Sequence, residues 1–556
     1  MSSYPVPSHA VPVCAGMIVA VPLELAASPL KSGRDLGDGD RSALVVGGTG
    51  KIRTGGTAVF CKVVAVAEAQ VTRDGQVRAQ GTPCALARLS GMEDWLDAQA
   101  GPGVIDGIAD RAVLDKRYVK GERERLLTAA FMIRVIVLWT LMPEAQLSDV
   151  IMALAGDLAL VPWSRRWHPA SERACLDWRK ALGPAPLEEL QAAVLGAARE
   201  EHREHAGDGE ALTAGTKEPL AVNSGDGSLL RVPDTPANRA AFGSVGTADD
   251  SAAWPCVRLF PLNDCLTRSL LGMPWGPAGT DKAAAEQRLL DAAMRDFAHV
   301  FTKDQVWLLD RLWHGTGRLA ALAQRTHFLA RLKSDIPLKR ISVTLPDGSY
   351  RAEISGDGVA MEVRVIEYDV DVEGQKVEEM FCLVTDLLDW QDYPALDLAR
   401  LYKWRWDGSE TALREAKAPL HGAGPGTGAM LRSGSPELIA QEIAAWSAAA
   451  EMTRGVTRDA ARAAQPARKG RRAGQPVRSR DLSLTRARRL ILAGIRSGYA
   501  GYQALTREIG RFRNACDRNR HRPRKSKSPS TFPHATLKDT ITRIAPAVIT
   551  LANTPA

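Results

Sequence analysis

At 556 residues the chain is too long for a single hydrophobic core, and its length predicts three or four domains. With 45% hydrophobic and 24% charged residues, its composition is that of a globular protein and excludes a disordered or fibrous chain. The formal charge of +8 is uneven, because residues 454–527 contain 22 Lys and Arg but only four Asp and Glu. The rest of the chain is therefore net acidic.

This cationic region indicates a polyanionic partner. Most of its charges are arginines, whose planar guanidinium groups match phosphate geometry, so we favour nucleic acid. A solvated tail is the alternative. The eight cysteines are scattered without a C-x-x-C pair, which argues against a zinc site or a disulfide framework and fits a reducing compartment. The longest apolar run, Leu126–Met142, contains Arg134 and predicts a buried helix rather than a membrane span. We therefore expect a cytoplasmic, nucleoid-associated protein with no membrane partner.

Residues 1–90 form an N-terminal extension of unclear fold, rich in Gly, Pro and Ser. Within it, Val45–Lys51 superficially resembles a phosphate-binding loop. It lacks the first Gly of that motif and the Ser or Thr after the Lys, so we interpret it as a turn between strands. The segment Thr57–Val71 predicts one or two strands.

Residues 91–210 predict a helical domain, because apolar residues recur every three or four positions. Ser171 is the expected N-cap of a short helix that includes Arg173, Arg179 and Lys180. Such a domain either binds DNA ends or is purely structural. The other predicted helices are Glu122–Met142, Leu147–Leu158 and Leu187–His205.

A polar linker at Glu210–Asn223 is expected to lead into an α/β domain, which we place at 211–335 and 386–452. Alternating apolar strands and an amphipathic helix predict a mixed sheet. The predicted strands are Ser228–Val232, Cys256–Phe260, Leu266–Leu271, Val306–Leu309 and Phe328–Leu332, and the helix is Lys282–Val300.

Residues 336–385 have a purely β pattern and predict a β insertion within that domain, with Asp-Gly turns at 347–348 and 357–358. Its expected strands are Ile341–Leu345, Tyr350–Ile354, Ala360–Tyr368 and Met380–Val384. Helices follow at Leu396–Lys417 and Pro436–Met452. A basic C-terminal region at 453–556 then has helices at Leu484–Ser497 and Tyr502–Arg511 and a flexible cationic segment at His521–Pro529.

Three acidic residues are candidates for catalysis. Asp310 follows a short apolar strand, where the sheet would fix its backbone and leave its carboxylate at the edge as a ligand for Mg²⁺. Asp226 lies between two glycines at the start of the first predicted strand, and taken alone it favours a turn. Glu410 shares a helix face with Arg414 and Lys417, which is also typical of a salt-bridged surface helix. The neighbouring Tyr and Trp residues at 402, 404 and 406 favour a DNA-contacting wall.

Taken together, three stretches resemble the bacterial insertion-sequence transposases of the DDE class, specifically the insertion element four family. They are Asp226–Gly243, Leu308–Trp313 and Tyr402–Lys417, the last of which resembles the family's Y-x₂-R-x₃-E-x₆-K signature. The segment with Ala181-Leu182-Gly183 resembles the family's N-terminal domain. One departure is that Glu410 comes five residues after Arg405 instead of four, while its spacing to Lys417 is kept. We interpret this as one extra residue in the segment 407–409, with Gly408 easing a helix start or bulge.

The resemblance implies a ribonuclease-H-like catalytic domain in which Asp226, Asp310 and Glu410 bind Mg²⁺, with Mn²⁺ as a substitute. The implied activity is cleavage of double-stranded DNA at transposon ends and joining of the freed 3′-OH to target DNA. A dimer on DNA is expected. The residues expected to contact DNA are Tyr402, Arg405, Arg414, Lys417 and Trp313.

Alternatives remain at this stage. Asp234 is the rival to Asp226, and Asp407 and Glu415 are the rivals to Glu410. Two alternatives to an active transposase are a nuclease on the same fold that no longer transposes and a transposase-derived DNA-binding protein without catalysis.

Overall fold

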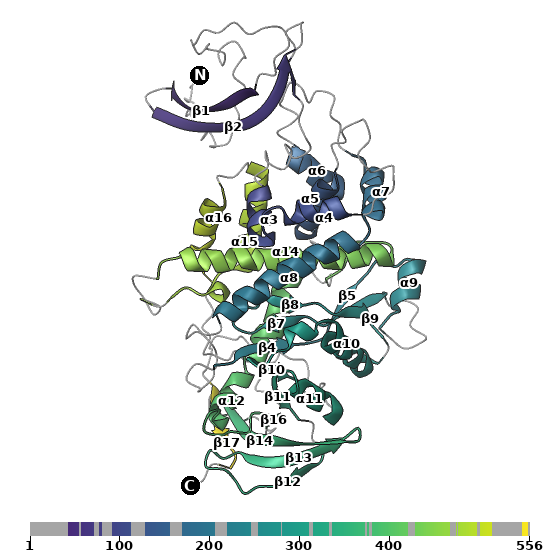
Figure 1. Cartoon of the computed structure of the whole chain (residues 1–556), viewed down its shortest axis with the longest axis vertical. Coiled ribbons are helices and arrows are strands. Elements are labelled where there is room, and N and C mark those ends of the chain that lie inside the picture. Colours follow the sequence, from purple (N-terminus) through teal and green to yellow (C-terminus); the bar gives the residue numbers. More distant parts are fainter. Residues whose placement is uncertain are drawn as a thin grey trace, which may run out of the picture.

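A helical layer lies next to a large mixed sheet in the computed structural model of the chain (Figure 1). The protein is therefore of the mixed α/β type. The predicted segment His521–Pro529 and the residue Trp313 lie outside the part that the structure describes. That part comprises residues 43–54, 57–71, 77–79, 92–112, 128–155, 170–205, 219–245, 254–279, 281–310, 315–332, 336–372, 375–376, 381–420, 429–466, 474, 476–497, 501–513 and 547–553.

The N-terminal extension contributes a three-stranded antiparallel sheet. Its strands are β1 (Ala43–Thr54), β2 (Thr57–Val71) and β3 (Val77–Ala79). The strand predicted at Thr57–Val71 is confirmed. The interpretation of Val45–Lys51 as a turn is wrong, because these residues continue through β1 and pair with β2.

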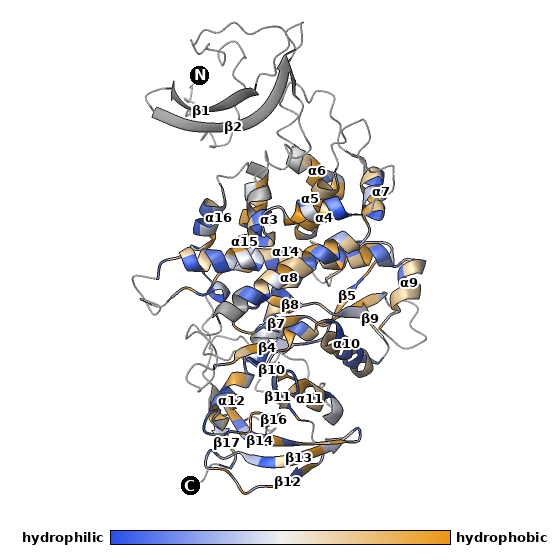
Figure 2. Cartoon of the chain, viewed as in Figure 1, coloured by the Kyte–Doolittle hydropathy of each residue, from blue (hydrophilic) through white to orange (hydrophobic). Residues whose placement is uncertain are grey.

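Six helices build the N-terminal part of the helical layer. Ser171 caps α7 as predicted, accepting a hydrogen bond from the Ala174 amide (3.2 Å). The helix α5 is buried along almost its whole length, and Figure 2 shows its apolar colouring within the layer. In the described residues, no helix is long and apolar enough to cross a membrane. The six are α3 (Met92–Ala100), α4 (Val104–Arg111), α5 (Ala129–Leu141), α6 (Leu147–Ala155), α7 (Glu172–Leu182) and α8 (Ala185–His205).

The central helix of this layer is α14 (Pro436–Ala463), which continues past the predicted end at Met452 and past the predicted domain boundary there. It packs in one hydrophobic core with α3 to α8 and with the C-terminal helices α15 (Leu484–Ser497) and α16 (Tyr502–Ile509). The predicted positions of α15 and α16 are confirmed. A short turn, η6 (Ser479–Asp481), precedes them.

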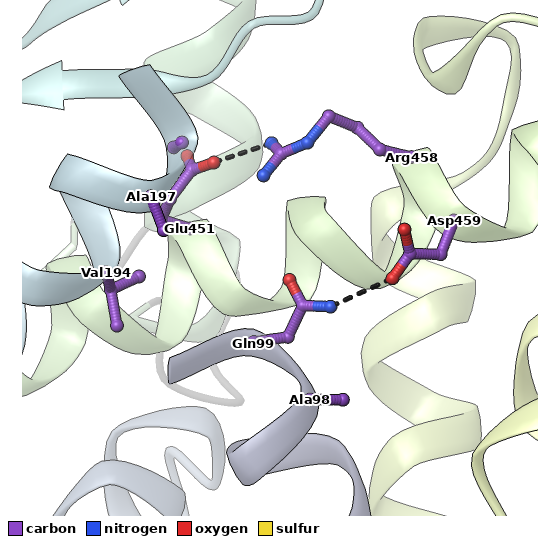
Figure 3. A pocket seen from close by; sticks show the side chains of 8 residues that line it. Ala98, Gln99, Val194, Ala197, Glu451, Arg458 and Asp459 are labelled. Carbon is purple, nitrogen blue, oxygen red and sulfur yellow. Dashed lines mark hydrogen bonds and ion pairs between the residues drawn. The ribbon is translucent and has the colours of Figure 1, made fainter. Parts of the chain in front are cut away.

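The start of the cationic region is not a DNA-facing surface. Arg454 and Arg458 lie on α14 and are buried. Arg454 donates to the Ala412 carbonyl (2.5 Å), and Arg458 pairs with Glu451 (2.6 Å) beside a small polar cavity (Figure 3). A charge count cannot distinguish such internal arginines from exposed ones.

The large sheet has the strand order β12-β13-β14-β16-β11-β10-β4-β7-β8. The strands β4, β10 and β11 are parallel, and β4–β7 and β7–β8 are antiparallel. Two short strands, β15 (Gln375–Lys376) and β17 (Ala547–Leu551), pair with β14. The central strands are β4 (Ala221–Gly225), β7 (Leu262–Asp264), β8 (Leu270–Gly272), β10 (Gln305–Leu309) and β11 (His327–Arg331).

The β insertion is continuous with this sheet, because β16 pairs with β11. Its strands are β12 (Leu338–Arg340), β13 (Tyr350–Gly356), β14 (Val359–Val372) and β16 (Phe381–Thr385). The strand predicted at Ile341–Leu345 is wrong. Val343 in that segment is 82% exposed, so its apolar side chain has no core to join.

The predicted linker at Glu210–Asn223 overlaps the central strand β4, so its end is also wrong. Asn, Ser and Gly in this strand are typical of turns, yet all five residues are buried. The buried Asn223 amide donates to Gln305 on β10 (3.0 Å), which satisfies a polar group that would otherwise oppose burial.

The remaining elements surround the sheet. A second sheet is formed by β5 (Ser228–Arg231), β6 (Cys256–Leu259) and β9 (Trp275–Pro277). The helices are α9 (Pro236–Phe242), α10 (Lys282–Asp296), α11 (Thr316–Ala323), α12 (Ala395–Tyr402) and α13 (Ala412–Lys417), with short turns η3 (Ala298–Val300), η4 (Asp407–Thr411) and η5 (Ala418–Leu420).

A buried polar cluster fixes α14 to the N-terminal helices. The Arg432 guanidinium lies 3.6 Å from the ring centroid of Trp139 on α5, and Arg179 of α7 lies 4.7 Å from the same ring. The fully buried Glu442 carboxylate accepts hydrogen bonds from the amides of Arg432 and Ser433 (both 3.0 Å). Glu442 therefore holds the segment that carries Arg432 against α14.

We expect Glu442→Ala to lower the free energy of unfolding by about 3 kcal/mol, because it leaves the amides of Arg432 and Ser433 and the Ser433 hydroxyl without their acceptor. Urea denaturation measures this. The matched control is Glu437→Ala on the same helix, where the exposed side chain predicts a change below about 1 kcal/mol. Equal effects of the two substitutions would contradict this assignment.

Candidate active site

Two of the predicted acids end adjacent parallel strands of the large sheet. Asp226 follows β4 and Asp310 follows β10. The same offset of 84 residues that pairs Leu308 with Ser224 relates Asp310 to Asp226, so the two aspartates leave the sheet in register. The expectation that Asp226 begins a strand is corrected, since it lies in the turn between β4 and β5.

Asp226 is an ion-pair partner of Arg405, with 3.3 Å between Oδ2 and Nη1. Burial, together with the negative charges of Asp310 and Glu410, raises the pKa of Asp226 to about 6 against the lowering effect of Arg405. Asp310 and Glu410 are therefore close enough to Asp226 to affect its ionisation, although the three acids are far apart in the sequence.

Tyr402 contributes differently from the prediction. It is buried at the end of α12, and its hydroxyl donates to the carbonyl of Leu309 (3.0 Å), the residue before Asp310. A direct phosphate contact by this hydroxyl does not fit such burial. The side chain instead fixes the end of β10, from which Asp310 projects.

Glu410 lies in a π-helical turn, η4, between α12 and α13. A π turn accommodates one residue more than an α-helix does over the same length, and such turns are frequent at functional sites. A π turn at this position would accommodate the extra residue that we infer from the sequence between Arg405 and Glu410. Glu410 itself is exposed.

The π turn lies directly on the sheet through Gly408. A methyl group at Gly408 would come within 2.5 Å of both the Ser224 hydroxyl on β4 and the Cys265 sulfur that follows β7. Gly408 is required for this close approach, since a β-carbon there would lift the turn that carries Glu410.

The predicted DNA-binding cations differ in exposure. Arg414 on α13 is exposed. Lys417 is half-buried, and it donates to the Ser228 hydroxyl and to the Leu229 carbonyl (2.8 Å) on β5. Burial lowers the pKa of Lys417 to about 8, against the opposing effect of Glu410. Lys417 therefore also holds α13 against β5.

The rival acids have other partners. Asp234 is paired with Arg239 on α9, and Glu415 with Arg268 (2.8 Å) in the turn between β7 and β8. Asp407 belongs to the same π turn as Glu410. These positions favour the assignment of Asp226 and Glu410 over the first two rivals.

Two further groups were not found from the sequence. Glu286 on α10 is buried and contributes to the raised pKa of Asp226. Arg480, from the C-terminal basic region, places its guanidinium 4.1 Å from the ring centroid of Trp404, beside Arg405. A glutamate on an amphipathic helix and an arginine in an arginine-rich region give no local sequence signal for such contacts.

The donor set suits a hard divalent cation by chemistry, because carboxylate oxygens are the ligands that Mg²⁺ prefers. Burial and mutual repulsion raise the pKa of Asp226, so a bound cation would relieve an unfavourable concentration of negative charge. Across the described residues, no three His, Cys, Asp or Glu side chains already converge as a formed metal cluster. Asp226, Asp310 and Glu410 are nevertheless the acids that would hold such an ion.

Comparison with known proteins supports the resemblance. Residues 107–192 match the family described as insertion element 4 transposase N-terminal. The chain is 23% identical over 229 residues to the transposase InsG for insertion sequence element IS4 of Escherichia coli (strain K12), covering 39% of this chain and 48% of that protein. The chain thus matches about half the length of this relative. The predicted relationship to the insertion element 4 transposases is confirmed.

Among solved structures, the piggyBac transposase synaptic complex with hairpin DNA is similar, with 11% identity and a TM-score of 0.35. The match covers 80% of this chain and 84% of that one.

The close contact of the π turn with the sheet at Gly408 can be tested with Gly408→Ala. If this site cleaves DNA with a bound metal, we expect the rate of cleavage to fall by about 100-fold, because displacement of a reacting group by about 1 Å has an effect of that size. The control is Gly434→Ala, where an added methyl group would meet only the Thr235 methyl group at 3.7 Å. Full cleavage by Gly408→Ala would contradict the claim that glycine is required at position 408.

The raised pKa of Asp226 predicts a pH-dependent cost to folding. The folded protein binds this proton up to about pH 6, whereas the unfolded chain releases it near the ordinary value of 3.8. The contribution of Asp226 to stability therefore falls as pH rises from about 4 to about 6. In metal-free buffer, Asp226→Asn should raise the free energy of unfolding at pH 8 by about 2 kcal/mol, with no gain near pH 4. A loss of stability at pH 8 in urea titrations would be the opposite result.

Proposed function

We propose that this chain is a DDE transposase. It would cut DNA at the ends of a mobile element and join the freed 3′-OH to target DNA. The observation that carries the proposal is the in-register placement of Asp226 and Asp310 at the ends of neighbouring parallel strands, with Glu410 on the adjoining π turn.

The proposed fold of the catalytic domain is ribonuclease-H-like. The proposal is supported by five consecutive strands of the large sheet, in the order β8-β7-β4-β10-β11, of which the last three are parallel. The β insertion falls between the second aspartate and the glutamate in the sequence, as the family resemblance implies. Ligands commonly bind beyond the carboxyl ends of parallel strands, where these two aspartates lie.

The chemistry would be phosphoryl transfer with Mg²⁺, for which Mn²⁺ would substitute. When bound, the metal would supply charge stabilisation and an activated oxygen nucleophile. The protein would hold the two aspartate carboxylates at a fixed spacing on the edge of a rigid sheet. Tyr402 would fix the backbone at Asp310, and Arg405 would orient the carboxylate of Asp226.

The substrate would be double-stranded DNA, both transposon ends and target. Exposed Arg414 is suited to a phosphate contact, and the half-exposed ring of Trp406, 5.2 Å from the Arg405 guanidinium, offers an aromatic face. Lys417 would act mainly by supporting α13. Because two ends must be processed together, we propose that the active form is a homodimer on DNA.

The decisive experiment uses DNA from both sides of the gene as substrate. Asp310→Asn should reduce Mg²⁺-dependent cleavage by at least about 1000-fold, because the exchanged group is a proposed metal ligand, and it should leave DNA binding within about threefold. Cleavage is measured on end-labelled DNA and binding by gel shift. The control is Asp296→Asn on the exposed end of α10.

Three outcomes separate the alternatives. Cleavage that survives in Asp310→Asn contradicts the proposed catalytic site. Wild-type protein that binds the DNA but never cuts it indicates a transposase-derived DNA-binding protein. Cleavage without strand transfer from supplied 3′-OH ends indicates a nuclease.

A further inference from the structure

The buried carboxylate of Glu286 lies next to the turn that carries Asp226. Glu286 is on the first part of α10, with its side chain 5% exposed, and it pairs with Arg258 on β6 at 2.9 Å. Arg258 is equally buried and also donates to the Ala278 carbonyl (3.1 Å). The pair is therefore held by two different elements and has little freedom to move.

Glu286 fills the space beside Gly227. A β-carbon added at Gly227 would lie 2.3 Å from Glu286 Oε1 and 2.5 Å from its Cδ. No real β-carbon makes contacts this short, so the peptide at 227 can approach α10 only because residue 227 is glycine. The position of this peptide is thus set by the Glu286 side chain.

The same peptide holds the carboxylate of Asp226. The Gly227 amide donates to Asp226 Oδ1 (2.8 Å), while Oδ2 accepts from Arg405. A shift of the 227 peptide would therefore rotate the Asp226 carboxylate. Gly225, on the other side, would place a β-carbon 2.9 Å from the Phe260 ring, so the turn is confined from both sides.

We infer that Glu286 is a positioning residue for the active site: the Arg258–Glu286 pair fixes the Gly227 peptide and, through it, the direction in which Asp226 presents its carboxylate. This inference rests on the proposed function, because it assumes that Asp226 binds a divalent metal. It goes beyond the three acids by adding α10 and β6 to the elements that shape the site.

Metal affinity tests the inference without relying on catalysis. Mn²⁺ binding to the purified full chain is measured by electron paramagnetic resonance of the free ion. We expect Glu286→Gln, which keeps the shape of the side chain and an oxygen acceptor for Arg258, to leave Mn²⁺ binding within about threefold of wild type, because Glu286 acts through its position and not through its charge. Metal-free DNA binding and the melting temperature should stay near wild type. The matched control is Glu144→Gln, at an exposed position outside the site.

A second pair of variants tests the position of the turn without removing any charge. Gly227→Ala changes no charge but forces the turn away from Glu286, and it should weaken Mn²⁺ binding by about 10-fold or more. Adding Glu286→Asp shortens the opposing side chain and keeps its charge. The double variant should recover to within about threefold of wild type.

The outcomes are distinct. Recovery in the double variant supports the positioning role. A double variant no better than Gly227→Ala, unchanged Mn²⁺ affinity in Gly227→Ala, or a 10-fold loss of affinity in Glu286→Gln overturns it while leaving the proposed function intact. Wild-type protein that binds no Mn²⁺ overturns the proposed metal site and this inference together.

Discussion

The parallel pairing of β4 with β10 is the constraint on which the rest of the site depends. Backbone hydrogen bonds between two buried strands fix the register, and the register brings Asp226 and Asp310 out side by side. Burial of Asp226, together with repulsion between the two carboxylates held in this way, raises the pKa of Asp226 to about 6. Arg405 compensates for part of this charge. The hydrophobic core on either side of the sheet holds these negative charges in place, and a bound cation would neutralise them.

Glu410 is placed by a π turn and not by the end of a strand. A helix approaching the sheet must both pack closely and turn Glu410 outward, and the π turn at Asp407–Thr411 accomplishes this with one additional residue. Gly408 permits the contact with β4 and β7. The C-terminal part of the chain also takes part, because Arg454 donates to the Ala412 carbonyl at the start of α13 and Arg480 lies over Trp404. The basic region thus partly supports α13 and the segment before it from inside the protein.

What the sequence predicts reliably is whatever depends on local pattern. The apolar strand before Asp310 and the N-cap at Ser171 could both be predicted, since each has a signal within a few residues. The strand before Asp226 could not, because its Asn, Ser and Gly are typical of turns, and the contact of the Asn223 amide with Gln305 has no local sequence signal. Glu286 could not be recognised either, since its importance comes from packing against Gly227.

The central claim is that three segments far apart in the sequence share one divalent ion. Iron-mediated hydroxyl-radical cleavage of the protein backbone tests it directly, with Fe²⁺ in place of Mg²⁺ in the full chain bound to its DNA. The account predicts fragments that end near residues 226, 310 and 410, and that disappear together when excess Mg²⁺ competes. Cuts near Asp234 or Glu415 without cuts near Asp310, or cuts that Mg²⁺ does not suppress, would contradict it.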